Sequence, residues 1–98
     1  MIRGEVWRYA PKGIPRERTV VIVSADGINN SSRPWLYGLE VVHEDPQDIL
    51  AVQLPGRLWV NGTSLSRLWR EWLCEHVGSL EDDAMEAVDA MLRTAIDL

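Results

Sequence analysis

The chain has 98 residues, of which 46% are hydrophobic and 26% charged, and its formal net charge is −5. This length suits one domain over residues 1–98, and this composition excludes wholesale disorder. No apolar run reaches the roughly 18 residues that a membrane span needs. Cys74 is the single cysteine, and no Cys/His cluster has metal-ligand spacing, so we expect a cytoplasmic protein without a disulfide, metal or cofactor.

The charge is divided unevenly along the chain. Residues 1–36 carry six basic and three acidic groups, whereas residues 37–98 carry four basic and twelve acidic groups. A protein that binds nucleic acid over its whole surface would be basic, so this chain offers only a local basic patch. Nine of the ten basic residues are Arg, which suits bidentate phosphate contacts. Genomic base composition would explain the same bias, so composition leaves both interpretations open.

The first half of the chain predicts three strands. Residues 2–9 alternate between two faces, which is typical of a half-buried strand, and residues 10–17 form a loop rich in Pro and Gly. The β-branched run Thr19–Val23 predicts a strand buried on both faces. A polar loop over residues 26–32 leads to a third strand over residues 34–43.

The second half predicts two more strands and a helix. The strands cover residues 49–54 and 57–60, with turns at 44–48, Pro55-Gly56 and Asn61-Gly62. Apolar residues at helical spacing favour a helix over residues 63–77. The last segment has Ser79 as a candidate N-cap, acidic residues in its first turn and an apolar stripe, so it predicts an amphipathic helix. The fold class is therefore α+β.

Three short motifs occur in an informative order. They are Gly4-Glu5-Val6-Trp7, Arg18–Asn29, and Val77–Leu80 leading into Glu81–Leu98. Together they resemble the MazF/PemK family of toxins from bacterial toxin–antitoxin pairs, over about half of the chain. The resemblance implies a small SH3-like β-barrel of about five to seven strands with a C-terminal α-helix, as in MazF and CcdB toxins. It also implies a strand over Arg57–Arg67 and a short helix around Leu68–Leu73.

The same resemblance implies a toxin-type endoribonuclease, an mRNA interferase that cleaves single-stranded RNA without metal. The RNA 2′-OH would attack the adjacent phosphorus, so the protein must accept that proton, stabilise the oxyanion and protonate the leaving 5′-oxygen. The family works as a homodimer. A cognate antitoxin holds it inactive by laying an extended acidic C-terminal segment across the same groove.

Two residues are the catalytic candidates. Arg18 matches the family's catalytic Arg, although Thr19 replaces the Pro that usually follows. Many members place a Thr near the end of the third strand, where this chain has Glu40–Asp45 and His43 is the nearest candidate. An imidazole can act as a general base or acid near neutral pH. His43 can equally be an ordinary exposed residue at a strand end.

The RNA-binding candidates come from the first half of the chain. Lys12 and Arg16 lie in the first loop and would contact phosphates. Trp7 and Trp35 would stack on bases, each stack contributing about 1–3 kcal/mol. Ser24 matches a family position but would serve a turn equally well.

The missing catalytic Thr keeps two alternatives open. One is a toxin of the same fold that inhibits DNA gyrase by binding, as CcdB-type toxins do. Those toxins end in Trp-Gly-Ile, whereas this chain ends in Ala95-Ile96-Asp97-Leu98, which disfavours that alternative. The other is a degenerate toxin that binds its antitoxin and has no nuclease activity.

Overall fold

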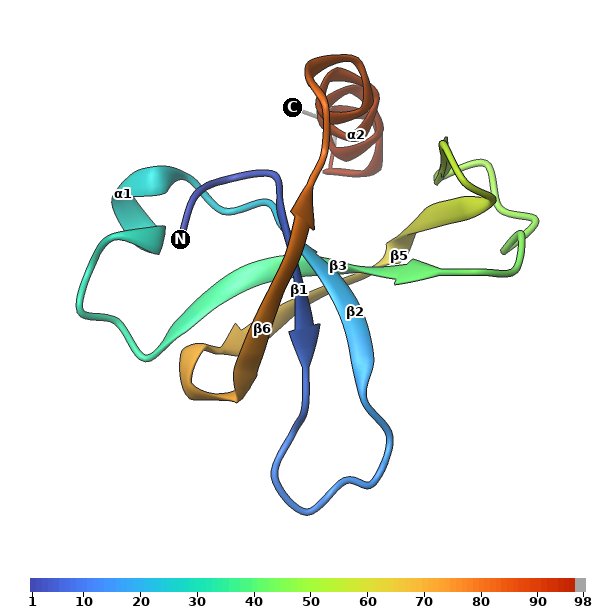
Figure 1. Ribbon diagram of the computed structural model, residues 1–98. Helices are drawn as coiled ribbons and strands as arrows, with labels where there is room; N and C mark the ends of the chain where they lie inside the picture. Colours follow the sequence, from blue (N-terminus) through green and yellow to red (C-terminus); the bar gives the residue numbers. More distant parts are fainter. Residues whose placement is uncertain (97–98) are drawn as a thin grey trace.

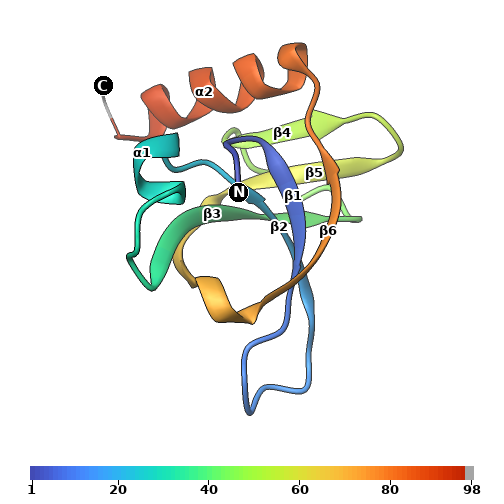
Figure 2. The ribbon, with the colours of Figure 1, turned by 60° about the vertical axis from the view of Figure 1, so that its left-hand side comes forward.

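The computed structural model describes residues 1–96, which form one antiparallel sheet with helices beside it (Figure 1). The elements in chain order are β1 (Glu5–Tyr9), β2 (Arg18–Ile22), α1 (Asp26–Asn29), β3 (Trp35–Val42), β4 (Ala51–Leu54), β5 (Leu58–Trp69), the 3-10 helix η1 (Arg70–Trp72), β6 (Leu73–Ser79) and α2 (Asp82–Ile96). The six strands lie in the order β4-β5-β3-β2-β1-β6. The sheet curls and α2 lies across one side of it (Figure 2).

The α+β prediction is confirmed, but the barrel is open because β4 and β6 remain edge strands. Among the described residues, no helix is long and apolar enough to cross a membrane.

Two hydrophobic clusters lie on opposite faces of the sheet and share β2. The cluster under α2 contains Val21, Val23, Leu39, Val41, Leu54, Val60, Val88, Met91 and Leu92. The cluster on the other face contains Tyr9, Val20, Ile22, Leu36, Leu68 and Leu73. Because successive strand residues point to opposite faces, β2 contributes alternately to both clusters. The prediction of a strand buried on both faces is confirmed.

A bulge interrupts the pairing of β5 with β3. Gly38 pairs with Ser66 and Glu40 pairs with Asn61, so several residues of β5 face the single residue of β3 between these pairs. The Ser64 hydroxyl fills the gap by accepting a hydrogen bond of 2.7 Å from the Glu40 N–H. Bulges bend a strand and re-aim the side chains beside it.

The predicted turn at Asn61-Gly62 is wrong, because both residues lie inside β5. Gly62 is buried beneath α2, where a Cβ would collide with the carbonyl oxygen of Leu50 and with Met91 Sδ. Glycine is therefore present for close packing of a strand and not for a turn.

The helix predicted over residues 63–77 is wrong for most of that segment. β5 continues to Trp69 and β6 begins at Leu73, and the residues between them form a single 3-10 turn, as the family resemblance implied. Leu68 and Leu73 are buried in the cluster that faces away from α2. Burial in the tertiary structure therefore overrides the local helical spacing.

Arg70 of η1 joins two distant segments. Its guanidinium donates hydrogen bonds to the carbonyl oxygens of Asn29 (2.6 Å), Arg33 (3.0 Å) and Ile28 (3.2 Å). These carbonyls belong to the end of α1 and the loop after it. Arg70 therefore donates the hydrogen bonds that the last carbonyl groups of a helix cannot receive from within the helix.

The start of α2 lies later than the sequence predicted. Ser79 ends β6 and does not cap the helix, which begins at Asp82. The Leu80 N–H instead donates to the Gly4 carbonyl (2.8 Å), which holds this connection against the start of the chain. The predicted apolar stripe is confirmed, since Val88, Met91 and Leu92 of α2 are buried.

Glu5 forms a small polar cluster between β1 and β6. Burial acts to raise the pKa of its carboxyl. Hydrogen bonds from the Ile2 N–H (3.0 Å) and Trp7 Nε1 (3.2 Å), with the positive charge of His76, outweigh burial and hold this pKa below its usual 4.5. A depressed carboxyl pKa stabilises the folded state above the unfolded-state pKa. That stabilisation is lost as the pH falls through the folded-state pKa.

We therefore expect the Glu5→Gln variant to lose less stability than the wild type when the pH falls from about 5 to 3. Urea unfolding at a series of pH values measures this difference. Glu86→Gln, at an exposed position of α2, is the matched control and should keep the wild-type slope. Identical slopes for Glu5→Gln and the wild type would contradict the assignment.

Candidate functional site

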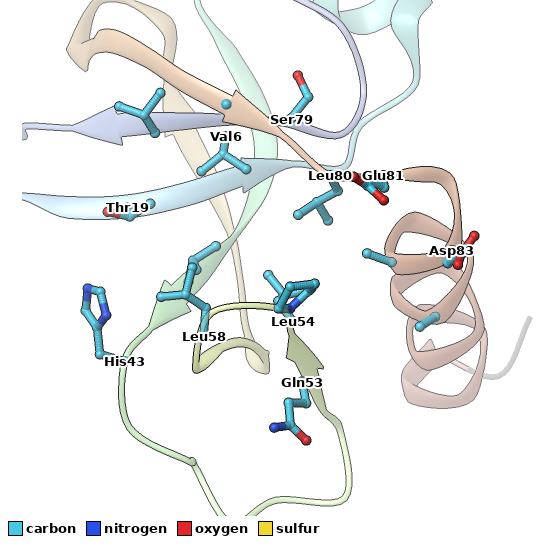
Figure 3. Close-up of a pocket in the computed structure, with 16 residues that line it drawn as sticks. Val6, Thr19, His43, Gln53, Leu54, Leu58, Ser79, Leu80, Glu81 and Asp83 are labelled. Atoms are coloured by element: carbon cyan, nitrogen blue, oxygen red, sulfur yellow. The ribbon is translucent and has the colours of Figure 1, made fainter.

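Two cavities lie beside the end of β3, and only one of them is lined by Arg side chains. The larger cavity, of about 620 Å³, lies where the sheet does not close. His43 is at one end of it, and Glu81 and Asp83, at the start of α2, are at the other end (Figure 3). No Arg or Lys of the described residues lines it. The second, of about 590 Å³, lies between the loop before β2 and the loop after β3, and it contains Arg16 and Arg18. We call this second cavity the Arg18 pocket. Its two Arg side chains make it the candidate site for a phosphate-bearing ligand, although Glu17, Glu40, Glu44 and Asp45 also line it.

Arg18 is held at the start of β2 by the strand beside it. It pairs with Tyr9 of β1, and its guanidinium carbon lies 5.5 Å from the centroid of the Tyr9 ring. Tyr9 is almost fully buried, and its hydroxyl accepts a hydrogen bond of 3.0 Å from the Trp69 N–H. Within residues 1–96 Arg18 forms no ion pair. A positioned guanidinium with free donors can bind two oxygens of a phosphate.

His43 follows β3 directly and lines both cavities. It is exposed, as is Arg16 across the Arg18 pocket. Three of the residues predicted from the sequence, Arg16, Arg18 and His43, are therefore brought to one pocket. Among the described residues, no three His, Cys, Asp or Glu side chains are grouped so as to hold a metal ion.

Two further candidates lie outside this pocket. Lys12 is exposed in the loop between β1 and β2. Trp7 lies opposite Val20, on the same face of the sheet as Arg18. Its ring is stacked on His76 at a centroid distance of 5.3 Å, so Trp7 is partly enclosed by the protein itself.

Trp35 and Ser24 are placed away from the Arg18 pocket. Trp35 begins β3, whereas the pocket lies where β3 ends. Ser24 is 6% exposed, and its hydroxyl donates to Asn29 Oδ1 (2.5 Å) and accepts from the Tyr37 N–H (3.2 Å). These bonds hold the turn into α1. Ser24 therefore holds this turn, one of the two roles that the sequence left open, and it does not line the Arg18 pocket.

The pocket also contains polar residues that the sequence does not select as candidates, among them Glu40 and Asn61. The sequence predicts a turn at Asn61 and gives no role to Glu40 of the third strand. The only sequence feature that singles out Glu40 is a carboxylate in the apolar run Leu39–Val42. Their meeting depends on the pairing of β3 with β5, two strands separated in sequence.

Comparison with known proteins identifies the fold. No family model matches the sequence, and no curated protein matches it significantly. A mycobacterial endoribonuclease in complex with its cognate antitoxin superposes with a TM-score of 0.87 at 19% identity, covering 100% of this chain and 96% of that chain. MazF from a MazE–MazF complex of Deinococcus radiodurans gives a TM-score of 0.85 at 16% identity, with coverages of 100% and 96%. The chain has the MazF fold.

A mycobacterial endoribonuclease without its antitoxin is also similar, with a TM-score of 0.83, 20% identity and coverages of 100% and 92%. The MazF fold expected from three short motifs is thus confirmed over the whole chain. A fold supports many chemistries, so the activity has to be argued from the residues of the site.

Proposed function

We propose that this protein is a toxin-type endoribonuclease that cleaves single-stranded RNA without a metal ion. The observation that carries the proposal is Arg18, a fixed guanidinium without an ion pair in residues 1–96, which lines one pocket with Arg16 and His43. The similar structures named as endoribonucleases support it. We place its action in the cytoplasm, where cellular RNA is the substrate.

The proposed reaction needs only the RNA and this pocket. The 2′-oxygen attacks the adjacent phosphorus, and the bond from phosphorus to the 5′-oxygen breaks. Arg18 donates hydrogen bonds to the non-bridging oxygens as negative charge accumulates on them. His43 moves a proton, and Arg16 holds a neighbouring phosphate. The products carry a 2′,3′-cyclic phosphate and a 5′-hydroxyl.

The direct test is to incubate the purified protein with mixed single-stranded RNA in EDTA. We expect fragments whose 5′ ends accept a radiolabelled phosphate without prior phosphatase treatment, because the reaction leaves a 5′-hydroxyl. RNA that stays intact at every pH from about 5 to 9 would overturn the proposal.

We also propose that the protein acts as a homodimer. Tyr37, Leu65, Trp69 and Ile96 are large apolar residues that are 36–51% exposed, and we call them the aromatic surface. The Arg67 guanidinium lies 5.7 Å from the Trp69 ring centroid. Exposed aromatic residues with Arg are typical of protein interfaces. A chain of this size also buries little core alone, so covering this surface with a second copy would stabilise it.

We expect Leu65→Glu to convert the dimer into a monomer, because it introduces a charge into the aromatic surface. Sedimentation equilibrium measures the change. Ile49→Glu is the matched control, since Ile49 is 95% exposed in the loop after β3, away from this surface. A wild-type protein that sediments as a monomer would contradict the proposed dimer.

We propose that an antitoxin binds this protein at the Arg18 pocket. The similar structures include complexes with an antitoxin. Arg16 and Arg18 would bind carboxylates of an extended acidic segment as they would bind phosphates. An antitoxin should therefore raise the apparent KM for RNA without changing kcat. Inhibition that lowers kcat alone would argue against a shared groove.

A further inference from the structure

Glu40 is a half-buried carboxylate in β3 to which the mechanism above gives no role. It lines the Arg18 pocket together with Arg18 and His43. Val20 of β2 and Asn61 of β5 lie directly opposite it on its two neighbouring strands. A charged group in the interior of a sheet loses hydration, which costs free energy unless a partner compensates.

No partner for this carboxylate lies within the described part of the chain. Its side chain forms no ion pair and no hydrogen bond among residues 1–96, whereas its backbone N–H donates to Ser64 Oγ. The bulge in β5 lies beside Glu40, where the register between Gly38 and Glu40 shifts. Bulges are over-represented next to active sites because they re-aim side chains.

Glu40 and Arg18 are diagonal neighbours on one face of the sheet. Val20 is opposite Glu40, and Arg18 precedes Val20 by two residues on the same strand, so their side chains share a face. Diagonal neighbours are separated by about 7–8 Å, within reach of long side chains. A ribose-phosphate unit held by Arg18 would therefore place its 2′-hydroxyl within reach of the Glu40 carboxylate.

We propose that Glu40 is the general base of RNA cleavage. This inference rests on the endoribonuclease function proposed above. The Glu40 carboxylate takes the proton from the 2′-hydroxyl, and the 2′-oxygen forms its bond to phosphorus. The bond from phosphorus to the 5′-oxygen breaks, and that oxygen takes a proton from the His43 imidazolium. Exchange of one proton between solvent and each side chain restores the starting state.

With this assignment, Glu40 supplies a second catalytic group in a chain that lacks the family's catalytic Thr. Cleavage needs one group to accept a proton and another to donate one, and His43 alone supplies a single group. A carboxylate and an imidazole in one pocket separate the roles of base and acid. The other titratable groups that line the pocket are Arg16, Glu17, Arg18, Glu44 and Asp45.

The test compares Glu40→Gln with the wild type on a single-stranded RNA that the wild type cleaves. Gln has the same shape but accepts no proton, so kcat should fall by about 10²–10⁴-fold. The acidic limb of the wild-type pH profile, on which kcat/KM rises with pH, should disappear in this variant. Glu40→Asp keeps the carboxylate at a shorter reach and should recover part of the rate.

Two controls separate catalysis from charge and from folding. Glu86→Gln removes a carboxylate at an exposed position of α2 outside the pocket, and it should keep the wild-type kcat and pH profile. Glu40→Gln should bind an uncleavable RNA with a 2′-deoxy residue at the scissile position at least as tightly as the wild type, because a negative charge is removed from the pocket. Thermal unfolding of Glu40→Gln confirms that the variant is folded.

The outcomes distinguish this inference from the proposed function. If the wild type cleaves RNA and Glu40→Gln cleaves it at the rate of Glu86→Gln, Glu40 is not the base and the nuclease function survives. A slow Glu40→Gln enzyme that keeps the acidic limb also overturns the inference, because Glu40 then acts only on structure. A wild-type protein that cleaves no RNA removes the proposed function and this inference together.

Discussion

Replacing Arg18 by Ala is expected to lower kcat for RNA cleavage by about 10²–10³-fold, which corresponds to about 2.7–4 kcal/mol of transition-state stabilisation. Arg18 lies over the Tyr9 ring and forms no ion pair within residues 1–96, so no ion pair has to break before its donors meet the phosphate. The variant should still bind the uncleavable RNA, more weakly by the loss of one phosphate contact. Steady-state kinetics on a defined oligonucleotide measures both effects.

Arg18→Lys and Arg57→Gly complete this experiment. Lys keeps the charge but cannot form the two parallel hydrogen bonds of a guanidinium, so we expect it to restore binding more than kcat. Arg57 lies between β4 and β5 with a φ of 60°, a conformation that glycine adopts without strain, so Arg57→Gly is a matched loss of one Arg. Its kcat should equal that of the wild type. Equal loss of activity in Arg57→Gly and Arg18→Ala would show that net charge, and not the position of Arg18, controls cleavage.

Replacing Gly62 by Ala is expected to destabilise the protein by about 3 kcal/mol. The added Cβ would collide with the Leu50 carbonyl oxygen and lie 2.6 Å from Met91 Sδ and 2.8 Å from Leu50 Cβ. The Met91 side chain can move, but the Leu50 backbone cannot do so without displacing the start of β4. For a domain of this size, we expect Tm to fall by more than about 10 °C.

Gly78→Ala is the matched control for Gly62→Ala. Gly78 also lies in a strand, but a Cβ there meets no atom within 4 Å. Because glycine weakens a strand relative to alanine, we expect Gly78→Ala to lose no stability and to gain at most about 1 kcal/mol. Differential scanning calorimetry compares the variants. A Gly62→Ala protein that melts with the wild type would mean that β5 does not pass this closely beneath α2.

Local sequence patterns were sufficient to predict the elements that lie in the same kind of environment along their whole length. The β-branched run of β2 predicted burial on both faces, and its residues alternate between the two clusters. The apolar stripe of the last helix predicted the face that packs on the sheet. Side-chain periodicity reports burial directly when one element lies against one core.

The same patterns failed where two distant segments meet. Residues 63–77 have helical spacing but form the end of β5, one 3-10 turn and β6, since Leu68 and Leu73 are buried by β-sheet pairing. Asn61-Gly62 has the composition of a turn but lies beneath α2. Neither environment can be read from neighbours in sequence, because backbone pairing and close packing with remote segments decide it.

The residues of the site divide in the same way. The amino-acid sequence was enough to select Arg16, Arg18 and His43 as candidates, because short motifs and residue chemistry mark them. Their meeting in one pocket, the burial of Ser24 and the position of Glu40 opposite Val20 and diagonal to Arg18 follow only from strand register. Register is set by long-range pairing and by the bulge in β5, so it is a property of the assembled sheet.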